Sequence, residues 1–356
     1  MDLTPKQKLA LYQIYDAITA KSRPEIKLGG YAGTGKTVLA KYLSHLFPDF
    51  AVCAYTGKAA NVLRKRDLAA TTIHSRIYRP VYENGSGRLL GFTLHEPEDF
   101  AFKGFICDEA SMVSKEIYQD MASFKLPLIF IGDHGQLEPV GTEFNLMKKP
   151  DIALEEIHRN AGPIARFAEK LRKGFRACAN DESDKVFIRS QRYLQESDYL
   201  SADQVICAYN KTRVNVNRLI RSALGLKANE PQVNDKVMCL MNNKRMGLFN
   251  GMQGYIRGLF EDEYGRLFMD FESDGILYTN IWYDNRFFNT EKPAFDYDSS
   301  ERPNPFDYAY AITCHKCQGD QWGKVLVLEQ VCKNWEHKRW AYTAASRAME
   351  TLTWAN

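Results

Sequence analysis

The sequence lacks any long uninterrupted apolar stretch. None of its 356 residues lies in a run that approaches the ~18 consecutive apolar residues of a membrane-spanning helix. The first residues, Met1 to Lys6, also lack the apolar region of a secretion signal. These absences argue against a membrane partner, and we expect a soluble protein that stays in the cytoplasm.

The sequence also has little net charge and few cysteines. With 47 basic and 44 acidic residues the formal charge is only +3, which neither demands nor excludes a nucleic-acid partner. The eight cysteines are scattered and should be free thiols in a reducing compartment. Cys314 and Cys317 form the only close pair, and no second Cys/His cluster exists to complete a zinc site.

What the sequence does have is an alternation of short apolar runs with helical patterns. Apolar residues from Leu9 to Ile18 recur at helical spacing, and Thr4-Pro5 before them resembles an N-cap followed by proline at the first helical position. Strands alternating with helices predict an α/β protein whose parallel sheet is covered on both faces. The clearest buried strands of the first half are expected at 51–55, 105–107 and 128–131.

The length of the chain predicts two or three domains. A second alternating section begins near residue 151, and its clearest strands are expected at 204–208 and 324–328. Between them, turn signals such as Asn250-Gly251 separate short strands and predict a small all-β insert. We expect a first α/β domain at 1–76 and 104–150, a β-hairpin insert at 77–103, a second α/β domain at 151–230 and 304–356, and the small β insert at 231–303.

The hairpin prediction rests on two short strand patterns around a turn. Residues 79–82 and 88–92 flank Asn84-Gly85-Ser86-Gly87, which is a strong hairpin signal. An ordinary surface hairpin would show the same pattern. If the hairpin instead meets a nucleic acid, Tyr82, Leu89 or Phe92 could provide a stacking surface for a base.

Residues 30–37 read G-Y-A-G-T-G-K-T and fit the P-loop pattern G-x-x-x-x-G-K-T, with a strand expected before them and a helix after. Glycines let backbone N–H groups approach phosphate, so Gly33, Thr34 and Gly35 are expected to cradle it at the helix N-terminus. Lys36 would add a positive charge at the β- and γ-phosphates, and Thr37 an oxygen ligand for Mg²⁺. The segment therefore predicts a site for a nucleoside triphosphate and Mg²⁺.

Polar residues follow two further strands of the first half. Asp108 and Glu109 come directly after the strand 105–107, where Asp108 can reach Mg²⁺ and Glu109 can act as general base on a water. Gln136 lies in the turn after the strand 128–131 and could hydrogen-bond a γ-phosphate or the attacking water. A solvated Asp-Glu turn and a structural Gly132-Asp133 turn are the alternatives for these segments taken alone.

Together with further segments, these motifs resemble a superfamily 1 DNA helicase of the RecD/Dda-like branch, over nearly the whole chain and in the family's order. Segments 55–60, 71–75, 132–137, 157–160, 313–319 and 342–348 resemble its motifs Ia, Ib, III, IV, V and VI. The resemblance implies two tandem RecA-like P-loop domains, with a β-hairpin insert in the first and a small β-barrel insert in the second. It further implies an ATP- and Mg²⁺-dependent enzyme that moves 5′ to 3′ along single-stranded DNA and unwinds forked or tailed duplex. A monomer is expected, with single-strand-binding or replication proteins as candidate partners.

The resemblance also implies roles for individual residues. Gln7 would read the adenine, Arg159 and Arg347 would be arginine fingers, and Gly319 and Gln321 would lie near the nucleoside. The family often has a glutamate where this chain has Gln321, and here Glu138 separates the motif III leucine from its proline. The residues expected to contact the DNA strand are Thr56, Lys58, Thr72, His74, Asn210, Arg213, Thr313, His315 and Lys316. The hairpin lies where the family carries its strand-separating pin.

Other interpretations remain open at this stage. Lys58 and Arg213 could be ordinary solvated charges, and His74 could be a packed histidine. The chain could also be a translocase that does not separate strands, or a DNA-binding subunit without turnover. Retention of Lys36, Glu109 and Arg347 argues against the last of these.

Overall fold

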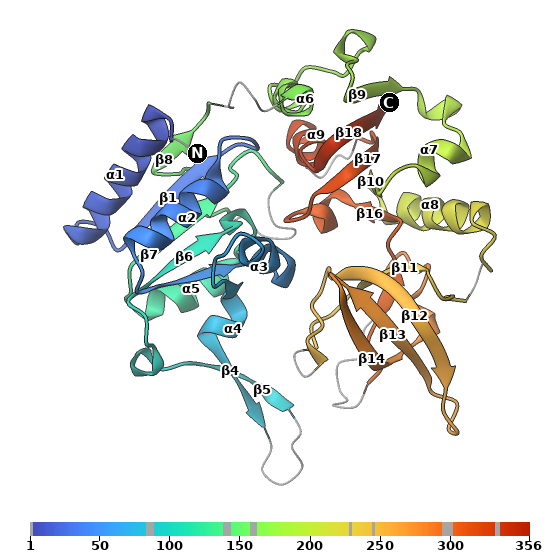
Figure 1. Ribbon diagram of the computed structural model, residues 1–356, viewed down its shortest axis with the longest axis horizontal. Coiled ribbons are helices and arrows are strands. Elements are labelled where there is room, and N and C mark those ends of the chain that lie inside the picture. Colours follow the sequence, from blue (N-terminus) through green and yellow to red (C-terminus); the bar gives the residue numbers. More distant parts are fainter. Residues whose placement is uncertain are drawn as a thin grey trace. The chain divides into compact units, whose positions relative to one another are not determined.

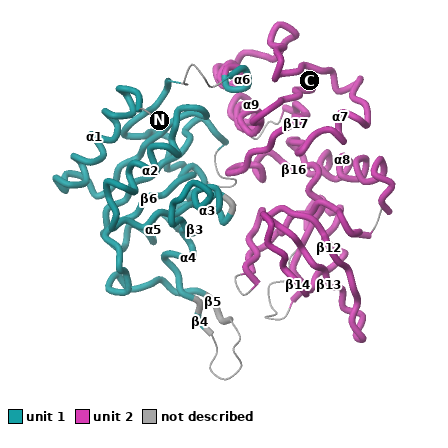
Figure 2. The backbone as a smooth tube through the Cα atoms, in the orientation of Figure 1, with its two compact units in different colours: residues 1–165 teal, residues 166–356 magenta. Residues whose placement is uncertain are grey.

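The computed structural model describes residues 3–82, 89–137, 144–156, 162–227, 230–243, 246–293, 302–331 and 335–356. The chain divides into two compact units, residues 1–165 and 166–356 (Figure 2). No helix in the described part of the chain is long and apolar enough to cross a membrane.

Unit 1 is built on a parallel sheet of six strands in the order β3-β2-β6-β7-β1-β8 (Figure 1). The strands are short and their residues are largely buried, as expected for a sheet covered on both faces. The strands are β1 (Glu25–Gly30), β2 (Phe50–Ala54), β3 (Thr71–Thr72), β6 (Gly104–Asp108), β7 (Leu128–Gly132) and β8 (Ile152–Leu154).

Two separate apolar cores hold helices against the two faces of this sheet. Ile106 shares one core with α1 (Pro5–Thr19), α2 (Lys36–Leu46) and α3 (Gly57–Arg64). The neighbouring Phe105 points to the opposite face and shares the other core with α4 (Ile73–Ile77) and α5 (Lys115–Ser123). The predicted layered α/β architecture is confirmed, as is the N-cap of α1 at Thr4 with Pro5 at the first helical position.

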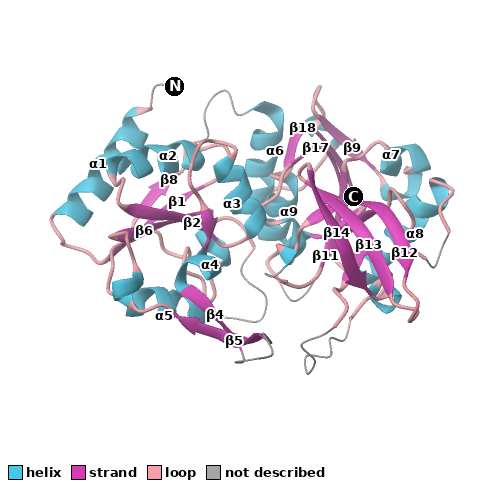
Figure 3. Cartoon of the chain, turned by 60° about the horizontal axis from the view of Figure 1, so that its bottom comes forward, coloured by secondary structure: helices cyan, strands magenta, loops and turns pink. Residues whose placement is uncertain are grey.

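A hairpin projects from unit 1 between α4 and β6. Its strands β4 (Tyr78–Tyr82) and β5 (Leu89–Leu94) pair antiparallel with each other (Figure 3). Among the described residues they pair with no strand of the six-stranded sheet. The turn expected at 84–87 lies outside the described residues.

Unit 2 is built on a second parallel sheet, in the order β16-β10-β17-β18-β9. On one face Val216 and Ile220 of α8 pack with Val205, and on the other Trp340 of α9 lies 6.1 Å from Trp354, ring centroid to ring centroid. The elements are α6 (Gly162–Arg172), β9 (Val186–Arg189), α7 (Glu196–Leu200), β10 (Gln204–Cys207), α8 (Asn210–Ala223), β16 (Ala311–Thr313), β17 (Trp322–Leu328), α9 (His337–Ala345) and β18 (Ala348–Ala355).

Short 3-10 helices complete the two units. They are η1 (Pro97–Asp99), η2 (Ala110–Met112), η3 (Ala179–Asp181), η4 (Gln191–Tyr193), η6 (Asn285–Phe287) and η7 (Cys314–Cys317). Two of them directly follow motif-bearing strands, η2 after β6 and η7 after β16.

Between α8 and β16 the chain forms an antiparallel sheet in the order β14-β13-β12-β11-β15. An isolated bridge brings the chain just before β15 to the last residue of β14, and there the Asn304 N–H donates to the Trp282 carbonyl at 2.7 Å. Phe271 and Phe306 are fully buried inside. The strands are β11 (Lys236–Cys239), β12 (Gln253–Glu261), β13 (Leu267–Ser273), β14 (Ile276–Tyr283) and β15 (Phe306–Tyr308).

A buried ion pair joins this insert to helix α8 of unit 2. The Arg221 Nε of α8 donates to Asp235 Oδ1 at 2.8 Å, and its Nη2 donates to Asp235 Oδ2 at 3.0 Å. Both side chains are almost fully buried, and the Arg221 guanidinium also lies over the Tyr308 ring. Such a bidentate pair specifies one orientation, because either charge left alone inside the protein would be strongly unfavourable.

Candidate nucleotide site and strand-contact residues

The P-loop runs from the end of β1 into α2, and its backbone requires glycine at defined positions. Gly33 and Gly35 have φ angles of +82° and +84°, in the left-handed region that glycine adopts without strain. A Cβ on Gly30 would lie 2.5 Å from the Thr34 hydroxyl oxygen. The loop is therefore closed tightly on itself and presents the N-terminus of α2 at its centre.

Lys36 folds back over this loop. Its Nζ donates to the Gly30 carbonyl at 2.7 Å and to the Tyr31 carbonyl at 3.1 Å, and lies 3.6 Å from Asp133 Oδ2. The ammonium is thus held at the mouth of the loop, where an anion would compete with these oxygens for it. Asp133 was not among the residues predicted for the site, although it directly follows the strand β7.

The order of the sheet brings three strand ends together. Because β7 lies between β1 and β6 and all three are parallel, their carboxyl ends place Lys36, Asp133 and Asp108 along one edge. Asp108 is buried, and this burial, with the neighbouring Glu109 carboxylate, raises the pKa of Asp108 to about 6. A positive charge bound beside Asp108 would therefore favour the ionised form of its carboxyl group.

Glu109 adopts a backbone conformation that is unusual for its residue type. Its φ is +54°, and its N–H donates to Asp108 Oδ1 at 2.9 Å. Its side-chain Oε2 is buried and has no hydrogen-bond partner among the described residues. A strained backbone together with a buried carboxylate oxygen that has no partner is typical of a functional position rather than of a solvated turn.

These residues fit a triphosphate with Mg²⁺. The described residues contain no group of three or more Asp, Glu, His or Cys side chains that could hold a metal by themselves. Mg²⁺ needs no such cage, since it commonly binds one or two protein oxygens and completes its shell with water and substrate phosphates. Thr37, in the first turn of α2, and Asp108 are the predicted protein ligands.

The turn after β7 carries Gln136. Gln136 is buried and its Nε2 lies 3.4 Å from Asp133 Oδ2, while the Gly135 N–H donates to Asp133 Oδ1 at 2.9 Å. The ring of His134 packs on that of Tyr31 in the P-loop, with centroids 4.3 Å apart. The turn therefore contacts both the P-loop, through His134, and Lys36, through Asp133. A residue that senses the γ-phosphate, as proposed for Gln136, would need such contacts.

Gln7 links helix α1 to the same loop. Its Nε2 donates to the Thr34 carbonyl at 3.0 Å, and its Oε1 accepts from the Thr4 N–H at 3.0 Å in the capping box of α1. The residue is therefore placed beside the P-loop, with one amide hydrogen engaged by it. Adenine recognition by Gln7 stays a prediction.

The predicted strand-contact residues of unit 1 are helix caps and their neighbours. Thr56 caps α3 by accepting from the Ala59 N–H, and Thr72 caps α4 by accepting from the Ser75 N–H, both at 3.1 Å. His74, in α4, packs with its ring 4.4 Å from Tyr78 and 5.0 Å from Phe92. The side chain of Lys58 lies outside the described residues.

In unit 2, Arg347 is buried at the end of α9. It donates from Nε to the Thr343 carbonyl at 3.0 Å, from Nη2 to Ser346 Oγ at 2.8 Å and from Nη1 to the Asp320 carbonyl at 3.3 Å. Gly319 has a φ of +81°, and Gln321 is exposed. The other predicted arginine finger, Arg159, lies outside the described residues.

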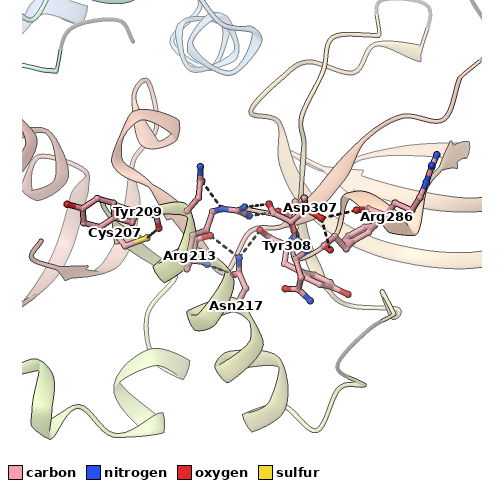
Figure 4. A network of polar contacts seen from close by, with 12 residues as sticks. Cys207, Tyr209, Arg213, Asn217, Arg286, Asp307 and Tyr308 are labelled. Carbon is pink, nitrogen blue, oxygen red and sulfur yellow. Dashed lines mark hydrogen bonds and ion pairs between the residues drawn. The ribbon is translucent and has the colours of Figure 1, made fainter. Parts of the chain in front are cut away.

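Arg213 is not the ordinary solvated charge that the sequence left open as an alternative to a strand contact. It is nine-tenths buried and forms an ion pair with Asp307 of β15, which Figure 4 shows facing it across the junction with the insert. Its Nη2 donates to the Thr290 carbonyl at 2.7 Å and its Nε to Asn210 Oδ1 at 3.3 Å. The Arg213 guanidinium therefore stabilises the junction with the insert, because without it Asp307 would be a buried carboxylate with no cation beside it.

The motif V residues lie at the end of β16. Thr313 ends the strand, and burial lowers the pKa of His315, whose ring lies 5.1 Å from Trp335. Lys316 is exposed and donates to Asn250 Oδ1 of the insert at 2.7 Å. The surrounding chain partly desolvates its ammonium and lowers its pKa. His315 would therefore meet a strand as a neutral ring, and Lys316 is the exposed cation of this segment.

Of the predicted pin residues, Phe92 is 41 % exposed. Its ring meets His74 edge-on, a contact that sequence spacing did not suggest. The side chains of Tyr82 and Leu89 lie outside the described residues.

Comparison with known proteins identifies two segments. The family described as AAA domain matches residues 3–191, and the UvrD-like helicase C-terminal domain matches residues 308–353. The ATP-dependent RecD2 DNA helicase of Deinococcus radiodurans is 25% identical, over 91% of this chain and 46% of its own length. The ATP-dependent DNA helicase dda of Enterobacteria phage T4 is 28% identical, over 63% of this chain and 57% of its own length. The chain thus spans about half the length of these curated relatives.

Solved structures with the same fold include helicases named Pif1. A crystal structure of Bacteroides Pif1 bound to single-stranded DNA superimposes with a TM-score of 0.64 at 19% identity, covering 100% of this chain and 92% of that one. Pif1 from Candida albicans gives a TM-score of 0.52 at 19% identity, covering 100% and 94%. At these identities the likeness shows the fold alone, an α/β chain with two parallel sheets. Residues 308–353 resemble the UvrD-like helicase C-terminal domain, and the chain is similar in sequence to the RecD2 and Dda helicases. The chain belongs to the AAA domain family.

Proposed function

We propose that this chain is an ATP-dependent DNA helicase that moves 5′ to 3′ along single-stranded DNA and unwinds duplex. The observation that carries the proposal is the meeting of Lys36, Asp133, Asp108 and Glu109 at the carboxyl ends of β1, β7 and β6. That arrangement suits phosphoryl transfer to water. The similarity of the chain to RecD2 and Dda suggests that ATP hydrolysis drives movement on DNA.

The proposed chemistry follows from the placement of each group. The P-loop amides and Lys36 would hold the β- and γ-phosphates of ATP, and Thr37 and Asp108 would hold Mg²⁺. When bound, Mg²⁺ supplies positive charge to the phosphate oxygens. Glu109 would orient the attacking water and accept its proton, which suits its buried and unpartnered Oε2. Gln136 would hydrogen-bond the water or the γ-phosphate, and Gln7 would select the base.

Arg347 and Arg159 are the proposed arginine fingers. The three donor groups of Arg347 are engaged by Thr343, Ser346 and Asp320. The proposal therefore requires Arg347 to exchange some of these bonds for phosphate oxygens during turnover. Charge-assisted bonds to phosphate are stronger than bonds to neutral carbonyls, so the exchange is favourable once the triphosphate is present.

The proposed strand contacts are backbone contacts without sequence preference. Thr56, Lys58, Thr72 and His74 in unit 1, and Asn210, Thr313, His315 and Lys316 in unit 2, would bind phosphate and sugar. Arg213 is excluded from this set, since its guanidinium holds Asp307.

Duplexes that carry a single-stranded tail of one polarity test this function. We expect ATP hydrolysis to be stimulated by single-stranded DNA, and only the duplex with a 5′ tail to be unwound. Unwinding of the 3′-tailed duplex alone would contradict the proposed polarity. Strong DNA-stimulated hydrolysis without unwinding of either substrate would show instead a translocase that does not separate strands.

The hairpin is the proposed strand separator. Replacing residues 80–92 by Asn-Gly would close a two-residue turn on the paired Arg79 and Thr93 and keep the base of the hairpin. We expect fork unwinding to fall at least about ten-fold, while single-strand affinity and DNA-stimulated hydrolysis stay within about two-fold, because a stacking wedge acts only at the junction. Undiminished unwinding by this variant would remove the hairpin from the mechanism.

The salt dependence of single-strand binding tests whether Lys316, but not Arg213, contacts a phosphate of the strand. Removing one phosphate contact should reduce the slope of log K against log salt concentration by about 0.7 for a single strand. We expect this change for Lys316→Gln and no change for the double variant Arg213→Gln/Asp307→Asn, which replaces the buried ion pair by two neutral side chains. A reduced slope in the double variant would show that Arg213 does contact the strand.

A further inference from the structure

Pairing with other strands does not fix the orientation of the hairpin β4–β5 relative to unit 1. Its two strands pair only with each other in the described part of the chain. An isolated two-stranded hairpin is at best marginally stable in water. Besides backbone hydrogen bonds to α4, side-chain contacts near its base therefore contribute to its orientation relative to the sheet of unit 1.

Tyr78, the first residue of β4, makes such a contact. Its hydroxyl donates a hydrogen bond to Asp120 Oδ2 on helix α5. Partial burial and the Asp120 carboxylate both raise the pKa of Tyr78, so the phenol remains a protonated donor at neutral pH. A hydrogen bond to an ionised acceptor is stronger than one between neutral groups.

A second contact ties the other strand to the same place. The ring of His74, on α4, lies 4.4 Å from the ring of Tyr78 and 5.0 Å from that of Phe92 on β5. Tyr78 pairs with Leu94, and Phe92 lies two residues before Leu94 on β5, so these three residues share one face of the hairpin. That face rests on unit 1, because Leu94 and Tyr78 also pack against the core beneath the sheet.

The partner helix is itself firmly held. Met121 of α5 is fully buried in that core, and Ser114 caps the helix by accepting from the Ile117 N–H at 3.3 Å. The Tyr78–Asp120 bond thus joins the hairpin to an element that cannot move without disturbing the core.

We propose that Tyr78 and Asp120 are positioning residues that hold the hairpin at a fixed angle to unit 1, so that strand movement separates the duplex instead of deflecting the hairpin. The proposal rests on the proposed function, because it assigns the anchor of the strand separator. A hairpin free to swing would yield to the incoming duplex, and ATP would be hydrolysed with fewer base pairs opened.

Tyr78→Phe tests the anchor by removing only the hydroxyl. We expect fork unwinding to fall about ten-fold, the shift in population that loss of one hydrogen bond to a charged group produces. DNA-stimulated ATP hydrolysis and single-strand affinity should stay at wild-type values, so that base pairs opened per ATP decline in proportion to unwinding.

Two further variants control for chemistry and for general destabilisation. Asp120→Asn keeps an oxygen that can accept from the phenol and should unwind nearly as wild type, whereas Asp120→Leu should behave as Tyr78→Phe. Tyr118→Phe is the matched control, because it removes a phenol–carboxylate bond of 2.7 Å to Glu25 from the same helix without touching the hairpin. It should leave unwinding unchanged.

Hydrogen exchange distinguishes failure of this inference from failure of the proposed function. The His95 N–H donates to the Ile77 carbonyl at 2.9 Å at the base of the hairpin, and we expect it to exchange faster in Tyr78→Phe than in Tyr118→Phe. Unchanged exchange, or wild-type unwinding by Tyr78→Phe while replacement of residues 80–92 lowers it, would overturn the anchor. A parallel loss of hydrolysis and unwinding would also overturn it, since a positioning residue leaves turnover intact. Undiminished unwinding after replacement of residues 80–92 would instead refute the pin, whatever the exchange shows.

Discussion

Lys36→Ala is expected to abolish ATP hydrolysis. The ammonium is the positive charge held at the mouth of the P-loop, 3.6 Å from Asp133 Oδ2 and bonded to two loop carbonyls. Without it, negative charge on the phosphates would meet the Asp133 carboxylate with no cation between them. Removal of a single preorganised donor from a site of developing charge lowers turnover by about 10²–10³-fold, and we expect at least this loss.

Lys41→Ala is the matched control for this prediction. Lys41 lies on the same helix, α2, but its Nζ is 3.5 Å from Asp67 in an exposed ion pair that contributes little to stability. Phosphate release with and without single-stranded DNA should be unchanged in Lys41→Ala. Turnover within a few-fold of wild type in Lys36→Ala would contradict the assignment of residues 30–37 as the catalytic phosphate loop.

Glu109→Gln is expected to retain ATP binding and to lose turnover. The substitution keeps the shape of a buried side chain whose Oε2 has no partner among the described residues, so the site should remain folded. The amide cannot accept a proton from water, and general-base catalysis contributes about 10²–10⁴-fold. The pKa of Asp108 should also fall toward its ordinary value, because the Glu109 carboxylate helps to raise it.

Binding of a fluorescent ATP analogue and phosphate release under single-turnover conditions would separate these two effects. Glu116→Gln, an exposed position on the following helix α5, is the control and should leave both quantities unchanged. Near-normal DNA-stimulated turnover in Glu109→Gln would show that another group activates the water.

Much of the candidate site could be read from local patterns. The P-loop, the Asp-Glu pair after β6 and the cap at Thr4 each depend on a few consecutive residues whose backbone geometry their own types dictate. The hairpin strands likewise follow from turn residues between two apolar patterns. These features appeared where they were expected, because the physical cause of each lies within about ten residues of chain.

Contacts between distant residues were not open to the same reasoning. Asp133 meets Lys36 because β7 is placed between β1 and β6, and that order follows from packing of the whole sheet. Arg213 pairs with Asp307 across 94 residues, so a side chain that looked like a strand contact is a buried link to the insert. His74 similarly meets Phe92 only after the hairpin folds against α4.

The sequence by itself therefore predicted the chemistry of the candidate site, a phosphate-binding loop with a carboxylate pair beside it, and its alternation of strands and helices predicted the covered parallel sheets that the structure contains. The tertiary structure alone decided which charges are available to a ligand and which hold the fold together. The physical reason is that a residue type sets what a group can donate, accept or carry, whereas its burial and its partners are set by segments that only folding brings near.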